Sequence, residues 1–214
     1  MAGDSNLVLK PAPLQAESPP IVLASRSSAR RMLLESACIR ADYQAADVDE
    51  HAIRTACRAQ GHDADHTALE LAVAKARAVT VPPGAFVIGA DQILTCNGTW
   101  FDKPENMPEA RSHLRQLRGQ SHTLHTAVVM MRDGRTLWRH VARPELHMRA
   151  FSDSFLDRYL QAEGEAILSC VGCYRLEGAG IHLFSRIEGD HAAIMGLPLL
   201  ALLGALRAQG ILLQ

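Results

Sequence analysis

A carboxylate and an ammonium group lie on either side of a short predicted hairpin in the middle of the chain. Residues 86–88 form an apolar run typical of a buried strand, and Gly89-Ala90 would remove bulk at its end and let a ligand approach the backbone. Asp91 follows at the mouth of this strand, and the turn dipeptide Asn97-Gly98 returns the chain to Lys103. Asp91 and Lys103 can therefore meet at one end of a sheet. Such a pair can hold a cation or a phosphate, or form a structural ion pair, and this stretch alone leaves these alternatives open.

Hydroxyl and guanidinium groups gather after a second apolar strand. Residues 21–24 run directly into Ser25, Ser27, Arg30 and Arg31, at the start of a predicted helix. Helix N-termini with nearby guanidinium groups are natural phosphate sites. The alternative is that a serine of this turn only caps the helix while the arginines stay solvated. Because arginine in a first helical turn opposes the helix dipole, an anion would resolve the conflict, and we favour phosphate binding.

Two further ionisable residues stand in sequence contexts that allow either a structural or a functional role. Glu50 lies in the acidic turn 48–51, where adjacent carboxylates either start a helix or bind a metal ion. Lys75 falls on or beside the apolar face of an alanine-rich helix predicted over residues 67–79. Such a lysine either extends its amine along the surface to water or points into a cleft.

The remaining helices and strands are predicted from periodicity and turn residues. Helices are predicted over 108–118, 152–161 and 198–209, paired strands over 122–131 and 135–146, and one strand over 181–184 within a glycine-rich segment. The proline-rich residues 1–19 predict a flexible N-terminal arm. The rest of the chain, residues 20–214, suits one domain.

Composition argues against several classes of protein. A net charge of −1 makes nucleic acid an unsuitable electrostatic partner, and no apolar run reaches the ~18 residues that a membrane span needs. Five cysteines without a recognisable secretory signal predict a reduced, cytosolic protein. Cys170 and Cys173 have the CxxC spacing of zinc or redox sites, but zinc needs a second ligand pair that is not evident in the sequence.

Several stretches of the chain, in order and at suitable spacing, resemble the Maf family of nucleoside triphosphate pyrophosphatases over residues 21 to about 210. They read LASRSSARRMLLE, ADVDE, ELAVAKARA, VIGADQ, DKP, GQSH, VGCYRLEGAG and EGDHAAIMGLPL. The resemblance implies an α/β fold, similar to ITPase-like pyrophosphatases, with an elongated, twisted mixed sheet flanked by helices and two lobes around an active-site cleft. It also implies cleavage of a nucleoside triphosphate between its α and β phosphates, with Mg²⁺ or Mn²⁺ as cofactor.

The residues that match the family's motifs suit this chemistry. In the family the aspartate that matches Asp91 is the proton acceptor, so we expect Asp91 to act as the base and Glu50, with Asp91, to supply oxygen ligands to the metal. Lys75 and Lys103 would neutralise charge on the α-phosphoryl group and the leaving pyrophosphate. We expect the phosphates to be bound by the residues at the start of the first helix: Ser25, Ser27, Arg30 and Arg31.

Residues at three positions distinguish the branches of the family that act on nucleotides with different bases. A branch that acts on dTTP and UTP has Asp-Thr in the central motif and Gln in the later one. A branch that acts on 7-methyl-GTP has Asp-Gln and Glu, with Trp before the paired arginines. Gln92 and Glu177 match the second branch, whereas Ala29 replaces its tryptophan. Because a carboxylate can accept both N1–H and N2–H₂ of 7-methylguanine, we expect 7-methyl-GTP to be the preferred substrate.

Two alternatives stay open. One is the same reaction on dTTP, UTP or modified pyrimidine nucleotides, and the other is a nucleotide-binding regulator of cell division without turnover. The resemblance also implies a homodimer. We expect a small-molecule nucleotide as the ligand, a cytoplasmic location, and neither nucleic acid nor a membrane as partner.

Overall fold

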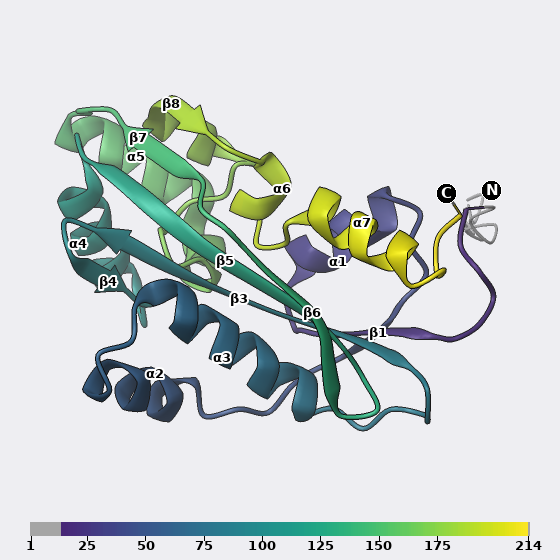
Figure 1. Cartoon of the computed structure of the whole chain (residues 1–214). Helices are drawn as coiled ribbons and strands as arrows, with labels where there is room; N and C mark the ends of the chain where they lie inside the picture. Colours follow the sequence, from purple (N-terminus) through teal and green to yellow (C-terminus); the bar gives the residue numbers. More distant parts are fainter. Residues whose placement is uncertain (1–13, 214) are drawn as a thin grey trace, which may run out of the picture.

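The computed structural model describes residues 14–213, which are built on an eight-stranded mixed sheet (Figure 1). The hydrogen-bonded order is β2-β1-β3-β5-β7-β8, with β4 paired to β3 and β6 paired to β5. β1 is parallel to β2 and to β3, and the other pairs are antiparallel. The strands are β1 (Ile21–Ala24), β2 (Asp42–Gln44), β3 (Phe86–Cys96), β4 (Thr99–Phe101), β5 (Ser121–Arg132), β6 (Arg135–Ala142), β7 (Glu145–Met148) and β8 (Phe184–Glu188).

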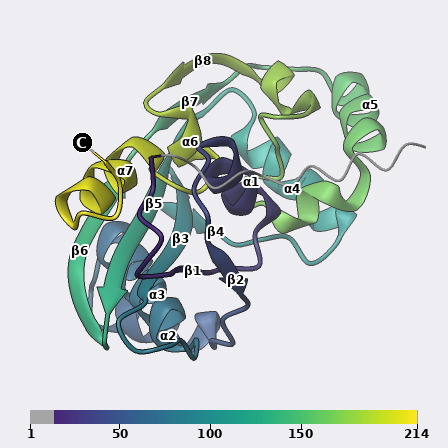
Figure 2. The same cartoon turned by 90° about the vertical axis from the view of Figure 1, so that its right-hand side faces the viewer.

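Helices flank this sheet on both faces (Figures 1 and 2). The α-helices are α1 (Ser28–Ser36), α2 (Glu50–Ala59), α3 (Ala64–Arg77), α4 (Met107–Leu117), α5 (Asp153–Glu163), α6 (His191–Ile194) and α7 (Leu199–Ala208), and the 3₁₀ helices are η1 (Gly164–Ser169) and η2 (Ala179–Leu183). The expected α/β fold with a mixed sheet flanked by helices is confirmed.

The two longest strands, β3 and β5, join two lobes. At one end, Leu94 and Leu124 share a core with buried residues of α4 and α5. At the other end, Ile88 and Met130 pack against α1 and α7 on one face of the sheet, while Ala127 and Val129 pack against α3 on the opposite face. The lobes therefore share one continuous pair of strands, and a residue in the middle of β3 lies between them.

Gly89 allows α3 to approach β3 closely. A Cβ at this position would lie 2.1 Å from the carbonyl oxygen of Ala72 and 2.9 Å from Cβ of Ala76. The space that the sequence suggested for a ligand is taken by a helix, so that prediction is wrong. The strand also does not end there, because β3 continues to Cys96 and places Asp91 in mid-strand rather than at a strand mouth.

Three other elements differ from the sequence predictions. The acidic turn is the start of α2, with Asp49 as its N-cap; a helix start was one of the two alternatives for this turn, but the extent of the helix to Ala59 was not predicted. The predicted strand 135–146 is divided into β6 and β7. The predicted strand 181–184 is mostly η2, and β8 begins only at Phe184, because periodicity cannot assign so short an apolar run next to glycines.

The predicted N-terminal arm falls mainly on residues 1–13, which lie outside the described residues. From residue 14 the chain runs beside the C-terminal segment: Gln15 forms a bridge with Leu212, and its side-chain amide exchanges two hydrogen bonds with the backbone of Arg40. Between residues 14 and 213, helices of the length and apolarity that a membrane crossing requires are absent.

Candidate active site

The site lies at a gap in the edge of the sheet. On one side of β3, β1 pairs with residues 86–89 and β4 pairs with residues 94–96. Residues 90–93 therefore have no strand partner on this side within the described chain. The carboxyl end of β1 and the N-terminus of α1 open onto the gap, which is where ligands bind in many α/β sheets.

Arg30 closes part of this gap from α1. Its guanidinium is buried and donates from Nη1 to the carbonyl oxygen of Ala90 (2.9 Å) and from Nε to that of Gly196 (2.7 Å). Burial lowers the pKa of Arg30, while the charges of Asp91 and Glu50 counteract it. Ser27 caps the helix by accepting a hydrogen bond from the Arg30 amide (3.3 Å). Arg30 therefore ties α1 to the strand that carries Asp91.

Lys75 holds two carboxylates together at the centre of the site. Its Nζ lies 2.8 Å from Oε1 of Glu50 and 2.5 Å from Oδ1 of Asp91. Burial of the Glu50 carboxyl acts to raise its pKa, but the charge and hydrogen bond of Lys75, together with the charges of Lys103 and Arg54, leave the pKa below its usual value. Lys75 points into the cleft, the second of the two alternatives that its position on α3 left open.

Asp91 is 3% exposed and has one oxygen still available. Within the described residues, Oδ2 is a buried atom without a hydrogen-bond partner. The nearest cation on that side is Arg54, whose Nη2 lies 3.8 Å away and whose Nη1 pairs with Asp102. The sequence analysis did not single out Arg54, because it left the helix start at Glu50 as one of two alternatives and did not follow the helix further. An amphipathic pattern from Glu50 onward would have placed Arg54 four residues after Glu50, on the same face.

The side chains around Asp91 enclose two adjoining chambers. The smaller, about 80 Å³ and named the inner chamber because the buried Asp91 lines it, is also lined by Gln92 and Arg54, and the larger, the outer chamber of about 540 Å³, adjoins it. Both chambers are lined by the same five residues: Ser27, Arg30, Glu50, Lys75 and Lys103. The structure thus brings together, from distant parts of the chain, most of the residues that the sequence singled out.

Lys103 is exposed as a whole, yet it lines both chambers. Burial lowers the pKa of Lys103, and the positive charges of Lys75 and Arg30 lower it further, whereas Glu50 and Asp91 act to raise it. The resulting pKa lies below that of a free lysine. A lysine whose pKa is lowered by burial and by neighbouring cations belongs to a surface prepared for a polyanion.

Arg31 takes a different position from the rest of the predicted set. Its guanidinium is paired with Glu35 at 2.7 Å and lies over the ring of Tyr43, 4.6 Å from the centroid. Its side chain is 58% exposed, and it lines neither chamber. Ser25, by contrast, lines the outer chamber and accepts a hydrogen bond from the Ser27 amide.

The three specificity residues are divided between the chambers. Ala29 and Glu177 line the outer chamber, together with Asp47, Arg26 and Arg175. Gln92 lines the inner chamber, where its amide nitrogen donates to Thr126 Oγ1 (2.8 Å) and to the carbonyl oxygens of residues 193 and 194. The outer chamber, as far as the described chain lines it, contains no aromatic ring.

Cys170 and Cys173 are both free thiols. Burial raises the pKa of Cys173 to about 12, and its Sγ lies 3.8 Å from Nδ1 of His113. Residues 14–213 contain no cluster of three or more His, Cys, Asp or Glu side chains that could hold a metal ion.

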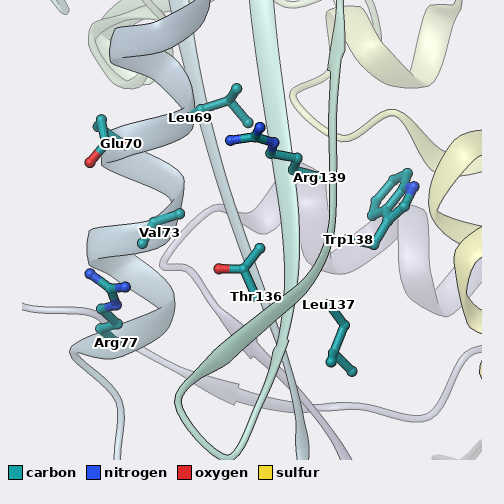
Figure 3. Close-up of a pocket in the computed structure, with 8 residues that line it drawn as sticks. All are labelled: Leu69, Glu70, Val73, Arg77, Thr136, Leu137, Trp138 and Arg139. Atoms are coloured by element: carbon teal, nitrogen blue, oxygen red, sulfur yellow. The ribbon is translucent and has the colours of Figure 1, made fainter.

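A separate hollow of about 430 Å³ lies between α3 and β6 (Figure 3). Thr136 and Arg139 extend from β6 toward the helix, whereas Trp138 points to the other side of the strand. The hollow contains none of the predicted site residues, and the two joined chambers remain the candidate active site.

A family model described as Maf-like protein matches residues 20–209. The chain belongs to the Maf family. A Maf relative from Gluconobacter oxydans, named nucleoside triphosphate pyrophosphatase, is 53% identical over 189 residues, which cover 87% of this chain and 93% of the relative. A protein of the same name from Rhodospirillum rubrum is 47% identical over 202 residues, covering 94% of this chain and all of the relative. A 7-methyl-GTP pyrophosphatase from Rhizobium etli is 44% identical over 194 residues, covering 90% of this chain and 98% of the relative.

Proposed function

We propose that this Maf protein hydrolyses the α–β phosphoanhydride of nucleoside triphosphates, with 7-methyl-GTP as its preferred substrate, and releases a nucleoside monophosphate and pyrophosphate. As a Maf-family member with relatives named for this activity, the chain is an enzyme, a hydrolase that acts on acid anhydrides. The choice of base is the part that is specific to this proposal.

The observation that carries the proposal is the buried Asp91 carboxylate in the inner chamber, which shares five lining residues with the outer one. The outer chamber, about 540 Å³, is of the size that holds a small organic ligand, while the inner one, about 80 Å³, has room for water but not for a nucleotide. A triphosphate brings about four negative charges, and Arg30, Lys75 and Lys103 at the junction supply the opposite charge.

The residues present suit a divalent cation. Glu50 and Asp91 already converge on one ammonium group, and Oδ2 of Asp91 is buried without a donor. Mg²⁺ prefers oxygen ligands and is usually bound through one or two carboxylates together with substrate phosphates, so a cluster of three protein ligands is not required. When bound, such an ion would polarise phosphoryl oxygens and balance their charge. Glu50 and Asp91 are the residues that would hold it.

Each side chain then has a defined part in the reaction. Oδ2 of Asp91 accepts the proton of a water molecule in the inner chamber, and that water attacks phosphorus. Lys75 orients Asp91 through Oδ1 and, with Lys103, balances the charge that develops on the α-phosphoryl group and on the leaving pyrophosphate. Arg30 and Ser27 fix the start of α1 at the phosphates.

The charges that line the outer chamber, rather than an aromatic ring that could stack on the base, support 7-methylguanine as the preferred base. N7-methylation makes guanine cationic, and Glu177 and Asp47 place two carboxylates in the outer chamber. Glu177 can accept N1–H and N2–H₂ together, which a pyrimidine with one N3–H between two carbonyls does not offer. Ala29 leaves the chamber without the tryptophan that would stack on the base, so recognition rests on these carboxylates. The relative from Rhizobium etli carries the corresponding name.

A substrate panel tests the proposal. Pyrophosphate release with Mg²⁺ is measured for 7-methyl-GTP, GTP, ITP, dTTP and UTP, and we expect the highest kcat/KM for 7-methyl-GTP. Glu177→Gln should reduce that preference by about tenfold or more, because one acceptor is replaced by a donor. Higher kcat/KM for dTTP or UTP would assign the chain to the pyrimidine branch. Absence of release from every nucleotide would favour a nucleotide-binding regulator. From the family resemblance we also propose that the protein is a homodimer and is located in the cytoplasm.

A further inference from the structure

Glu163, the last residue of α5, places a carboxylate in the interior of the second lobe. Its side chain is 3% exposed. Oε2 accepts hydrogen bonds from Nε of Arg175 at 2.8 Å and lies 2.8 Å from its Nη2, and Oε1 accepts one from the backbone amide of Ala179 at 2.5 Å. One carboxylate thus holds two points of the chain that are four residues apart.

These two points, the side chain of Arg175 and the amide of Ala179, hold a tight turn on either side. The amide of Gly178 donates to the carbonyl oxygen of Arg175 at 3.2 Å, which closes a β-turn with Glu177 as its third residue. Arg175 and Glu177 both line the outer chamber, whereas Glu163 lines neither chamber. The turn displays Glu177 to the ligand, and Glu163 supports it from behind.

The base of the turn has no spare room. A Cβ on Gly178 would lie 2.5 Å from Oε1 of Glu163, and one on Gly180 would lie 2.4 Å from the carbonyl oxygen of Arg175. A buried carboxylate is costly unless it is fully paired, and the guanidinium fork of Arg175 and the Ala179 amide offset that cost only in this arrangement. The contacts therefore fix the turn in one position.

We propose that Glu163 is a positioning residue for base recognition, because its buried carboxylate clamps both ends of the turn that presents Glu177 to the outer chamber. This inference rests on the proposed function, in which Glu177 accepts hydrogen bonds from the base. Hydrogen bonds to a planar base edge depend steeply on placement, so a turn released at either end loses discrimination before it loses catalysis at Asp91.

GTP and ITP provide the matched substrates, because they differ only in the 2-amino group that Glu177 would bind. Glu163→Gln keeps the shape of the side chain but turns an amide NH₂ toward a donor, either Arg175 or Ala179. We expect the ratio of kcat/KM for GTP to that for ITP to fall by roughly tenfold, mainly through KM for GTP, with kcat for ITP little changed. Glu165→Gln is the control, since Glu165 is exposed on the next turn of the chain, and it should leave the ratio unchanged.

A second variant guards against loss of folding. If the Glu163→Gln protein does not fold, Glu163→Asp takes its place. Aspartate keeps the charge but is one methylene too short to reach both Arg175 and Ala179, so the ratio of kcat/KM for GTP to that for ITP should fall in this variant too. An unchanged ratio, or an equal loss for GTP and ITP, in a folded variant overturns the inference. If Glu177→Gln leaves the wild-type ratio intact, it is the base contact in the proposed function that fails, and the two failures are thereby distinguished.

Discussion

At the scale of single residues, the site depends on how charges share a small buried space. Lys75 satisfies one oxygen of each of two carboxylates, which leaves Oδ2 of Asp91 as the buried oxygen without a donor in the described residues. An oxygen in that state has a strong tendency to take a proton or a cation. This arrangement suits the two roles proposed for Asp91, as a base and as a metal ligand beside Glu50.

The lowered pKa of Lys103 gives a prediction about pH. Lys103 acts in its charged form, and burial holds its pKa below the usual lysine value of about 10.4, so the charge is lost earlier as the pH rises. The kcat/KM profile, which reports the free enzyme, should fall on the alkaline side below that value. In Lys103→Arg, whose guanidinium stays charged, this alkaline limb should move upward by at least about one pH unit. Both proteins are measured on one substrate, so ionisation of the nucleobase affects the two profiles equally. Coincident alkaline limbs would refute the role of Lys103.

At the scale of elements, the position of Lys75 depends on the contact between α3 and β3. The backbone of α3 reaches Gly89 because that residue has no side chain, and Lys75 lies on the same helix between Ala72 and Ala76, the two residues nearest to Gly89. The helix can thus deliver Lys75 to Asp91, two residues further along β3.

Two glycine-to-alanine changes should have opposite effects. Gly89→Ala forces α3 away from β3 and should cost about 1–3 kcal/mol of unfolding free energy, together with activity, because Lys75 moves with the helix. Gly204→Ala in α7, where a Cβ meets nothing within 4 Å, should stabilise the fold by about 0.5–1 kcal/mol and leave kcat unchanged. Urea unfolding and initial rates measure both variants. A Gly89→Ala protein with wild-type stability would show that the contact is not tight.

The sequence predicted the types of the site residues better than their placement. Asp91, Glu50, Lys75 and Lys103 were found because a charge in an apolar context is visible locally. Adjacent helical residues point about 100° apart, and in the structure Arg30 lines both chambers whereas Arg31 lines neither, a difference that the sequence analysis did not predict. The packing of α3 on Gly89 joins segments that are distant in sequence, and no local pattern encodes it.

At the scale of the whole molecule, the site lies where two lobes meet on shared strands. β3 and β5 run through both cores, and the gap between β1 and β4 exposes the middle of β3 at that junction. The helices α1, α2 and α3 supply Arg30, Glu50 and Lys75 to the chambers, and the segment after α5 supplies Glu177 and Arg175. Residues from both ends of the sheet therefore line the two chambers.

The most direct test of this account is to measure turnover and binding together in Asp91→Asn. The asparagine keeps the shape of the side chain and an acceptor for Lys75 but removes the base, so kcat for pyrophosphate release should fall by at least about 100-fold. The Kd for the nucleotide, measured by calorimetry, should change far less, and the surface variant Asp157→Asn should behave as wild type. An Asp91→Asn protein that still releases pyrophosphate at near wild-type rate would contradict the central claim that this carboxylate activates the attacking water.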